Sequence, residues 1–257
     1  MRYIYIIILL LLFFFKPLKA DDKGPERAIY EEATEEYRNN NFARSLELFE
    51  KLTEAGYSSF NLYYNTGNAA FKTGNIPAAI LNYEKALLLK PFNEDARHNL
   101  EIARTYTVDK LEDIPEIFFI RWFRLFSLLL STNSWALLSI ISFALALALA
   151  TVFLFSARYR MKKYTFTASV LLIAVSILTF VLSLTNRSLT GNNDEAIVFE
   201  PQVTGTSSPG TGGRELFVIH EGTKVEIGEK LGDWYEIKLS DGTVGWIPTD
   251  FVKKIIP

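Results

Sequence analysis

Two long apolar runs constrain the fold of this chain more than any other feature. The first run spans residues 134–157 and the second spans residues 164–186, and neither contains a charged residue. Each run exceeds the ~20 residues that a helix needs to cross the hydrocarbon core of a membrane. The sequence therefore predicts two transmembrane helices joined as an antiparallel hairpin. Two buried core helices of a soluble protein are the alternative, which the uninterrupted apolar length disfavours.

The segment between the two runs determines the predicted orientation of the hairpin. Four of the residues 158–163 are Arg or Lys, and no acidic residue occurs between Glu116 and Asp194. Basic loops stay on the cytoplasmic side because positive charge resists translocation. We therefore expect residues 158–163 to form a cytoplasmic loop of a bacterial inner-membrane protein with two spans. The chain on both sides of the hairpin is then predicted to lie in the periplasm.

The first 20 residues have the features of a signal peptide. Arg2 precedes an apolar run that ends at Phe15, and Ala20 supplies a small residue at the cleavage position. Two lysines after the apolar run are atypical, so an uncleaved anchor stays open. Either version exports the residues that follow. The chain contains no Cys, which excludes disulfides, thiolate metal sites, cysteine nucleophiles and lipid attachment at a cysteine.

Residues 26–59 and 60–93 align with each other without gaps as two copies of one repeat. Aromatic and aliphatic residues coincide in the two copies, which indicates a pair of helices in each. In the second copy, Gly67 and Ala79 are small at the positions where paired helices approach each other, and the aromatic residues fill the gap between repeats. In this spacing the second copy resembles the tetratricopeptide repeat.

The resemblance implies an all-α repeat domain with a binding face. We expect this domain to span residues 21–110, with residues 94–106 as a capping helix. Two repeats and a cap are near the minimum that buries a continuous core, and a third repeat from another chain stays open. In this family the first helix of each repeat lines a concave face that binds peptides. That face here presents Arg38, Tyr64, Asn65, Asn68, Lys72, His98 and Asn99.

Two interpretations of the repeat face stay open. Its amides and cations are similar to the carboxylate-binding clamps of some family members, where such donors hold the carboxylate at the end of a peptide. However, an asparagine at the position of Asn65 is also frequent in ordinary repeats. The resemblance therefore implies protein binding more firmly than it implies a clamp.

Residues 113–131 are predicted to form an amphipathic helix on the membrane surface. Arg121, Arg124 and Ser127 recur at helical spacing and form a narrow polar stripe, while aromatic residues and leucines cover the rest of the helix. This pattern is typical of a helix that lies in the interface, where arginines reach the headgroups of membrane lipids. A third span is disfavoured because it would move the repeat domain to the other side of the membrane.

The last part of the chain changes to short alternating strands. After a linker at residues 187–194, we expect a small β domain over residues 195–257, with residues 202–213 as a loop rich in Gly, Ser, Thr and Pro. Gly232-Asp233-Trp234-Tyr235 and the stretch from Gly245 to Val252 resemble the bacterial SH3 domain. The resemblance implies an all-β SH3-like barrel and therefore completes a multidomain membrane protein of repeats, hairpin and barrel.

The SH3 resemblance also implies a ligand face. Its candidate residues are Trp234, Trp246, Pro248 and Phe251. The opening motif of the family is absent and the loop over residues 202–213 carries no acidic residue, which disfavours recognition of proline-rich peptides. A peptide or peptidoglycan is the expected ligand. The alternative is that these aromatic residues form the core of the barrel.

The sequence predicts binding rather than catalysis. The two histidines lie on different domains, and no metal-ligand cluster, phosphate-binding loop or nucleophile motif occurs, so we expect no enzyme, metal or cofactor. The spans contain no ionisable residue, which disfavours an ion path. The acidic flanks and the export signal disfavour nucleic acid as a partner.

The order of signal, tetratricopeptide repeats, two-span hairpin and SH3-like domain resembles the BatE-type proteins of the aerotolerance (Bat) operon of the Bacteroidetes. This resemblance covers the whole chain. It implies a membrane scaffold or assembly factor for envelope stress tolerance, with Bat-type membrane proteins that carry von Willebrand factor A domains as partners. A cell-wall sensor or targeting protein, whose SH3-like domain binds peptidoglycan, is the alternative function.

Overall fold

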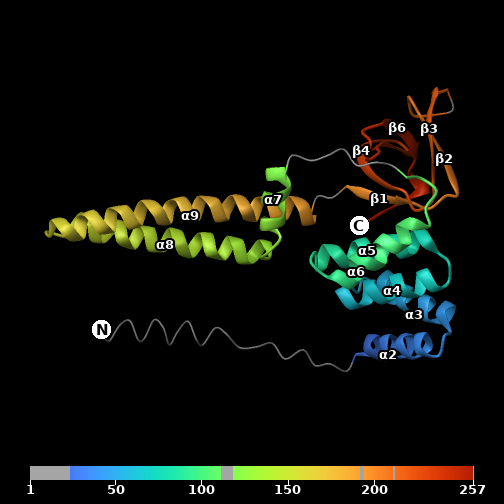
Figure 1. The fold of residues 1–257 in the computed structure, drawn as a ribbon, viewed down its shortest axis with the longest axis horizontal. Coiled ribbons are helices and arrows are strands. Elements are labelled where there is room, and N and C mark those ends of the chain that lie inside the picture. The colour runs from blue at the N-terminus through green and yellow to red at the C-terminus, as the bar shows by residue number, and fades with distance from the viewer. Residues whose placement is uncertain (1–23, 111–117, 192–193, 211, 257) are drawn as a thin grey trace. The chain divides into compact units, whose positions relative to one another are not determined.

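The computed structural model describes residues 24–110, 118–191, 194–210 and 212–256. It contains helical repeats, two long apolar helices and an antiparallel sheet, so the predicted fold class is confirmed (Figure 1). The chain forms two compact units, Met1–Tyr57 and Ser58–Pro257. The predicted signal peptide at residues 1–20 lies outside the described residues.

The first unit contains the two helices of the first repeat, α2 (Pro25–Arg38) and α3 (Phe42–Glu54). This copy has Ala33 where the second copy has Gly67, and Ser45 where the second copy has Ala79. Both side chains are fully buried, and the Ser45 hydroxyl donates a hydrogen bond of 2.8 Å to the carbonyl of Ala33. The polar substitution is therefore tolerated because its hydroxyl has a partner at the helix contact.

The second repeat and its cap are α4 (Phe60–Lys72), α5 (Ile76–Leu89) and α6 (Glu94–Thr105). Each helix begins after a residue whose side chain accepts a hydrogen bond from the first turn. These residues are Ser59, Asn75 and Asn93, which accept from backbone N–H groups at 3.2, 3.2 and 2.8 Å. Such caps set the start of each helix, and they place the polar residues of α4 and α6 in fixed register.

The hairpin consists of α8 (Thr132–Phe155) and α9 (Tyr159–Gly191). Most of the basic segment predicted as a loop belongs to the first turns of α9, because Lys and Arg favour helices and residues 156–158 suffice for the reversal. Between the helices, the Ser139 hydroxyl contacts the backbone carbonyl of Ser176 at 2.9 Å, and the Ser176 hydroxyl donates back to Ser139 at 3.0 Å. Ser169 makes a similar bond to Ala146 at 3.0 Å.

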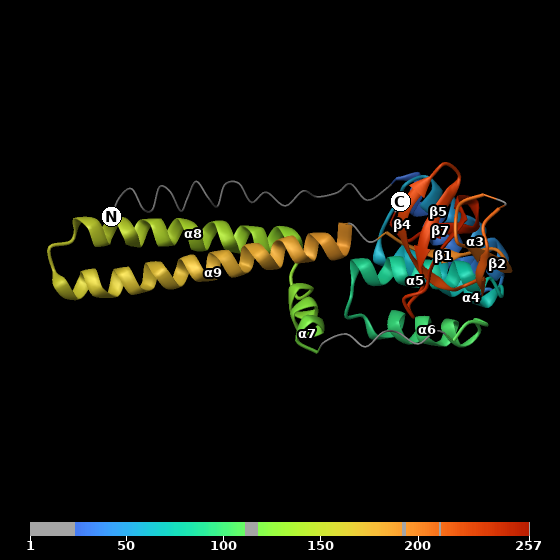
Figure 2. The ribbon, with the colours of Figure 1, turned by 90° about the horizontal axis from the view of Figure 1, so that it is seen from above.

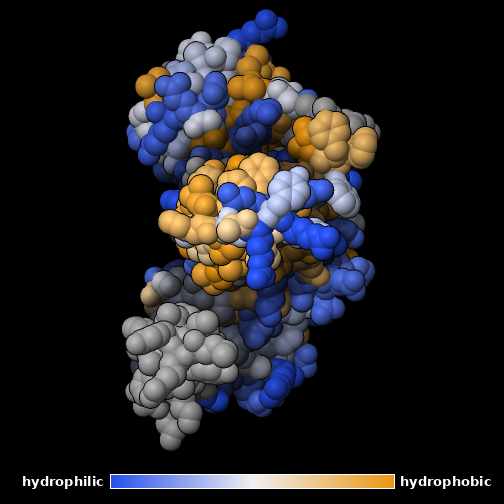
Figure 3. Space-filling view, turned by 90° about the vertical axis from the view of Figure 1, so that its left-hand side faces the viewer, coloured by the Kyte–Doolittle hydropathy of each residue, from blue (hydrophilic) through white to orange (hydrophobic). Residues whose placement is uncertain are grey.

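The outer surface of the hairpin is apolar. Both helices are long and apolar enough to cross a membrane, and only 17% and 28% of their most apolar windows are buried. A core helix of a soluble protein would be mostly buried, so this exposure is compatible with a membrane protein with two spans. Seen from the tip of the hairpin, hydrophobic side chains dominate its surface, with hydrophilic side chains among them (Figure 3).

Helix α7 (Phe118–Ser127) precedes the hairpin. It falls within the amphipathic helix predicted for residues 113–131, of which residues 113–117 lie outside the described residues. The helix ends at Ser127, and Ser131 caps the start of α8 by accepting a hydrogen bond from the backbone of Ser134 at 3.2 Å. In Figures 1 and 2, α7 lies next to the start of α8 and is steeply inclined to both hairpin helices, and α9 extends past it.

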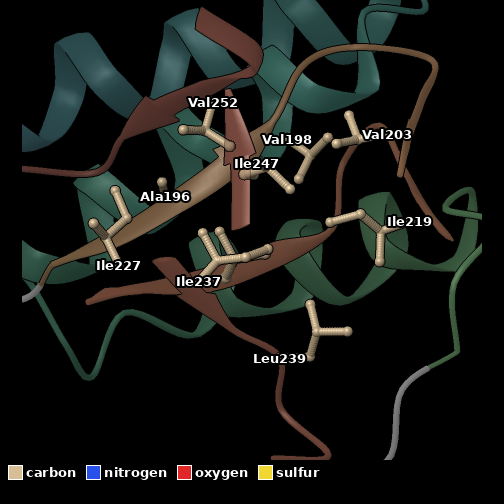
Figure 4. Packing of buried hydrophobic residues seen from close by; sticks show 10 residues of the cluster. Ala196, Val198, Val203, Ile219, Ile227, Ile237, Leu239, Ile247 and Val252 are labelled. Carbon is tan, nitrogen blue, oxygen red and sulfur yellow. The ribbon is translucent and has the colours of Figure 1, made fainter. Parts of the chain in front are cut away.

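The C-terminal sheet has seven antiparallel strands in the order β3-β2-β6-β5-β4-β1-β7. The strands are β1 (Glu195–Val198), β2 (Gln202–Thr206), β3 (Glu215–His220), β4 (Lys224–Leu231), β5 (Trp234–Lys238), β6 (Val244–Pro248) and β7 (Val252–Lys254). Their inward residues form one core of Val, Ile, Leu and Ala, with residues of β1, β4, β5 and β6 facing one another (Figure 4).

The loop predicted for residues 202–213 is wrong in its first half, which forms β2. Val203 is buried in the core, and Gly205 lies against the ring of Phe217 on β3, where an added Cβ would be 2.2 Å from the ring. The Gly, Ser and Thr content suggested a loop, whereas this glycine is needed for close packing between two strands.

Candidate binding site

A glycine brings the two helices of the second repeat close together. A Cβ atom built on Gly67 of α4 would lie 2.7 Å from the ring of Tyr83 on α5, and Tyr83 is only 1% exposed. Only glycine fits at this position without displacing the ring. At this separation the Tyr83 hydroxyl donates a hydrogen bond of 2.8 Å to Oδ1 of Asn68.

Asn68 is the centre of a hydrogen-bonded group that joins α4 to α6. Its Oδ1 also accepts a hydrogen bond of 2.9 Å from Nδ2 of Asn99. The same nitrogen of Asn99 donates to the Tyr64 hydroxyl at 3.2 Å. We call Tyr64, Asn68, Tyr83 and Asn99 the asparagine cluster. Three of the residues predicted for the repeat face are thus brought together, on a support that holds their side chains in place.

The other residues of the predicted repeat face lie outside this cluster. Asn65 is half-buried on α4, while Lys72 and His98 are exposed. Arg38 is exposed on α2 in the first compact unit, 3.6 Å from an acidic neighbour on its own helix. Because the Asn99 nitrogen already donates within the cluster, a carboxylate clamp would depend on the remaining amides and cations, and it stays a prediction.

The predicted SH3 face is built on two neighbouring strands. Trp234 on β5 pairs with Pro248 on β6, and Glu236 on β5 pairs with Trp246 on β6. All four are half-buried and alternate with core residues such as Ile247, so their side chains project from the opposite side of the strands. The structure therefore brings Trp234, Trp246 and Pro248 to one face.

Phe251 has a different environment. It packs against the barrel core together with Tyr235, as the core interpretation of the aromatic residues expects, and a ligand role of the four residues stays a prediction. Sequence reasoning missed Glu236, which stands two positions after Trp234 and therefore shares its face. No described residue forms a hydrogen bond or ion pair with its carboxylate. Its carboxylate lies next to Gly228 on β4, where an added Cβ would be 2.9 Å from Oε2. An acidic group on the same face as two tryptophans suits a cationic ligand group.

The repeat domain and the β domain contact each other directly, although one precedes the hairpin in the sequence and the other follows it. Asp109, after α6, accepts hydrogen bonds from the backbone N–H of His220 at 2.6 Å and from the Thr223 hydroxyl at 2.5 Å. Its other oxygen lies 3.0 Å from Nδ1 of His220. Burial alone would raise the pKa of Asp109, but the hydrogen bonds from Thr223 and His220 lower it below its ordinary value.

A second polar group lies in the same contact. Lys224 on β4 is 3.2 Å from Glu84 on α5 and 2.8 Å from Glu195 on β1. Glu84, whose side chain is 11% exposed, also pairs with Arg104 on α6 at 2.6 Å. Burial alone would lower the pKa of Lys224, but Glu84 and Glu195 raise it above its ordinary value. Two carboxylates and two cations thus balance each other between the domains.

The turn before β4 fits closely against the repeat domain. Gly222 is buried with a φ of +84°, and an added Cβ would lie 2.7 Å from Thr107 and 3.3 Å from Ile80. Glycine is required here both by its backbone conformation and by the space. We call the whole set the docking contact: Ile80, Glu84, Arg104, Thr107 and Asp109 with Glu195, His220, Gly222, Thr223 and Lys224.

Comparisons with known families agree with this architecture. The tetratricopeptide repeat model matches residues 30–96, and the bacterial SH3 domain model matches residues 207–253. A search of curated proteins finds no match to the chain. Both matched families are typically non-catalytic interaction modules. Within the parts of the chain that the structure describes, no group of three or more His, Cys, Asp or Glu residues is placed to hold a metal ion.

Proposed function

We propose that this protein is a membrane-anchored scaffold that holds partner proteins through its repeats and a second ligand through its SH3-like face. The docking contact carries the proposal. It joins a domain that precedes the hairpin to a domain that follows it, for example through Glu84 and Lys224 at 3.2 Å. Direct contact requires one compartment, which supports two spans with both interaction modules on the same side of the membrane.

We assign that compartment to the periplasm. The support is electrostatic: the tip of the hairpin carries Arg158, Arg160, Lys162 and Lys163, and all four are exposed. Such a tip is retained in the cytoplasm because positive charge resists translocation. The flanks, with all of the acidic residues of the chain, then lie outside the cytoplasm. The apolar start of the chain acts in the same direction, as an export signal.

The partners that we propose follow from the family resemblance and the chemistry of the repeat face. The resemblance to BatE-type proteins names Bat-type membrane proteins with von Willebrand factor A domains. Helices α4 and α6, which the asparagine cluster joins, also carry Asn65, Lys72 and His98, and we propose that these side chains contact an extended peptide of such a partner. Affinity would come from hydrogen bonds to a support that is already ordered, which lowers the entropic cost of binding.

The test is capture of partners from membranes that contain the full chain. Lys72→Glu reverses a charge on the repeat face, and Lys51→Glu makes the same change at an exposed position on the second helix of the first repeat. We expect Lys72→Glu to lose the captured Bat-type partner and Lys51→Glu to retain it. Equal capture by both variants and by the wild type would exclude this face as the binding site.

The alternative is a cell-wall sensor or targeting protein, and the outward tryptophans favour it. Trp234 and Trp246 lie on one face with Pro248, and exposed aromatic faces bind sugars and peptides alike. Full chain in detergent would be sedimented with purified sacculi, beside Trp234→Ala as the control. Sedimentation that Trp234→Ala abolishes supports the cell-wall function, whereas no sedimentation supports the protein scaffold.

A further inference from the structure

The end of α7 is locked to the hairpin by hydrogen bonds. The carbonyl of Ser127 accepts from the indole N–H of Trp135 at 2.8 Å and from Nδ2 of Asn186 at 2.9 Å. The same Asn186 nitrogen donates to the carbonyl of Leu130 at 3.2 Å, and Oδ1 of Asn186 accepts from Thr132 at 2.6 Å. These bonds satisfy the last carbonyl of α7 and join α7, α8 and α9 at one corner.

This corner fixes the direction of α7. Ser127 is fully buried, and Trp135 and Asn186 are 6% and 4% exposed, so the corner is packed as well as hydrogen-bonded. In both views α7 runs across the long axis of α8 and α9 (Figures 1 and 2). If the hairpin crosses a bilayer, a helix held across its end runs along the membrane surface rather than through it.

The surface of α7 is suited to that position. Phe118 is 81% exposed, Trp122 is 73% exposed and Phe119 is 58% exposed, so large aromatic side chains project from the protein. Arg121 is exposed and flanks this aromatic group, about 60° round the helix from Phe118 and about 100° from Trp122 at 3.6 residues per turn. Arg187, next to Asn186 on α9, is also exposed and supplies a further cation at the corner.

We propose that α7 is a lipid-binding helix, which lies in the leaflet next to the two binding domains and holds the phosphates of anionic phospholipids with Arg121 and Arg187. The occupant is the bilayer because the apolar surface of α7 continues that of the hairpin. Charge favours anionic lipid, since residues 118–191 contain no Asp or Glu. Arginine near a membrane surface gains attraction to anionic headgroups, and its guanidinium matches phosphate geometry.

The depth of α7 is measurable because the natural chain contains no cysteine. Single cysteines at Phe118, Arg121 and Trp122 of the full chain would be spin-labelled in nanodiscs of phosphatidylcholine and phosphatidylglycerol. Oxygen and nickel-complex collisions then report the depth of each label. We expect labels at Phe118 and Trp122 below the phosphates and the label at Arg121 at or above them.

Two other depth patterns would overturn the proposal. A steady change of depth from Phe118 to Trp122 would indicate a helix that enters the membrane end-on. Full water access at all three positions would indicate that α7 lies away from the lipid. Neither pattern depends on the repeat face or the SH3-like face, so this test is separate from that of the proposed function.

The preference for anionic lipid is tested by native mass spectrometry of lipids retained from an equal mixture of phosphatidylcholine and phosphatidylglycerol. An arginine near the surface contributes attraction that corresponds to roughly fivefold enrichment of anionic lipid. We expect such enrichment in the wild type, its loss in Arg121→Gln/Arg187→Gln, and its retention in Arg214→Gln, which changes an exposed arginine of the β domain. Equal retention of both lipids by the wild type would refute the anionic preference.

Discussion

The contact between Gly67 and Tyr83 allows the effect of one methyl group to be worked out in advance. In Gly67→Ala the new Cβ would lie 2.7 Å from two ring atoms of Tyr83, closer than real carbon contacts. The ring has no room to retreat, since Tyr83 is 1% exposed and its hydroxyl is bonded to Asn68 at 2.8 Å. Overpacking a core costs about 1–3 kcal/mol.

Two smaller effects modify this cost. Alanine favours a helix over glycine by up to about 1 kcal/mol. Displacement of the ring breaks the hydrogen bond to Asn68, which costs about 1 kcal/mol. These two effects nearly cancel, so we expect Gly67→Ala to lower the free energy of unfolding of the second repeat by about 1–3 kcal/mol. The asparagine cluster would lose its support from Tyr83 at the same time.

Hydrogen exchange of the full chain in detergent measures this loss locally. A loss of 1–3 kcal/mol corresponds to roughly 5- to 150-fold faster exchange of the protected amides in α4 and α5. Gly212→Ala is the matched control, because its added Cβ meets no atom within 4 Å and its φ is not positive. Unchanged or slower exchange in Gly67→Ala would refute the argument from helix separation.

Three further predictions concern the docking contact and the SH3-like face. Lys224→Met removes a cation from between two carboxylates, so the distance between spin labels at Thr105 and Glu221 should broaden and lengthen. The same distance should stay constant from pH 7 to pH 5 and lengthen only below about pH 4. The pKa of Asp109 is lowered in the folded protein, so its contribution to the stability of the docking contact is present above its ordinary pKa of 3.8. That contribution is lost as acid protonates the carboxylate. Trp234→Ala should abolish capture of the SH3-face ligand in pull-downs while the repeat-bound partner is retained, and loss of both would contradict independent faces.

Local patterns in the sequence were sufficient to predict the repeats and the two long apolar helices. The small residue at Gly67 and the aromatic residue at Tyr83 follow a known spacing, and the absence of charge in residues 134–157 is sustained over a whole span. The start of α9 was less predictable. Basic residues after Arg158 indicate a loop by charge, whereas their helix propensity extends the helix to Tyr159.

The docking contact could not be predicted because its partners are far apart in the sequence. Asp109 and His220 are separated by 111 positions, and Glu84 and Lys224 by 140. Each of these side chains, taken singly, has the character of a solvated surface charge. Glu236 was predictable in principle, since alternation in a strand places it beside Trp234, but its register with Trp246 follows only from the pairing of β5 with β6.

The most direct test of the account is a zero-length cross-link across the docking contact of the natural chain. Nζ of Lys224 lies 3.2 Å from the carboxylate of Glu84, close enough for a carbodiimide to join the two groups as an amide. The full chain in membranes would be treated with a water-soluble carbodiimide, with Lys224→Arg as the control, which keeps the charge but has no amine to couple. We predict an intramolecular link between Glu84 and Lys224, seen by mass spectrometry as a link between peptides from before and after the hairpin, and none in the control. No link between these two peptides in the natural chain would contradict the central claim that both binding domains dock on the same side of the membrane.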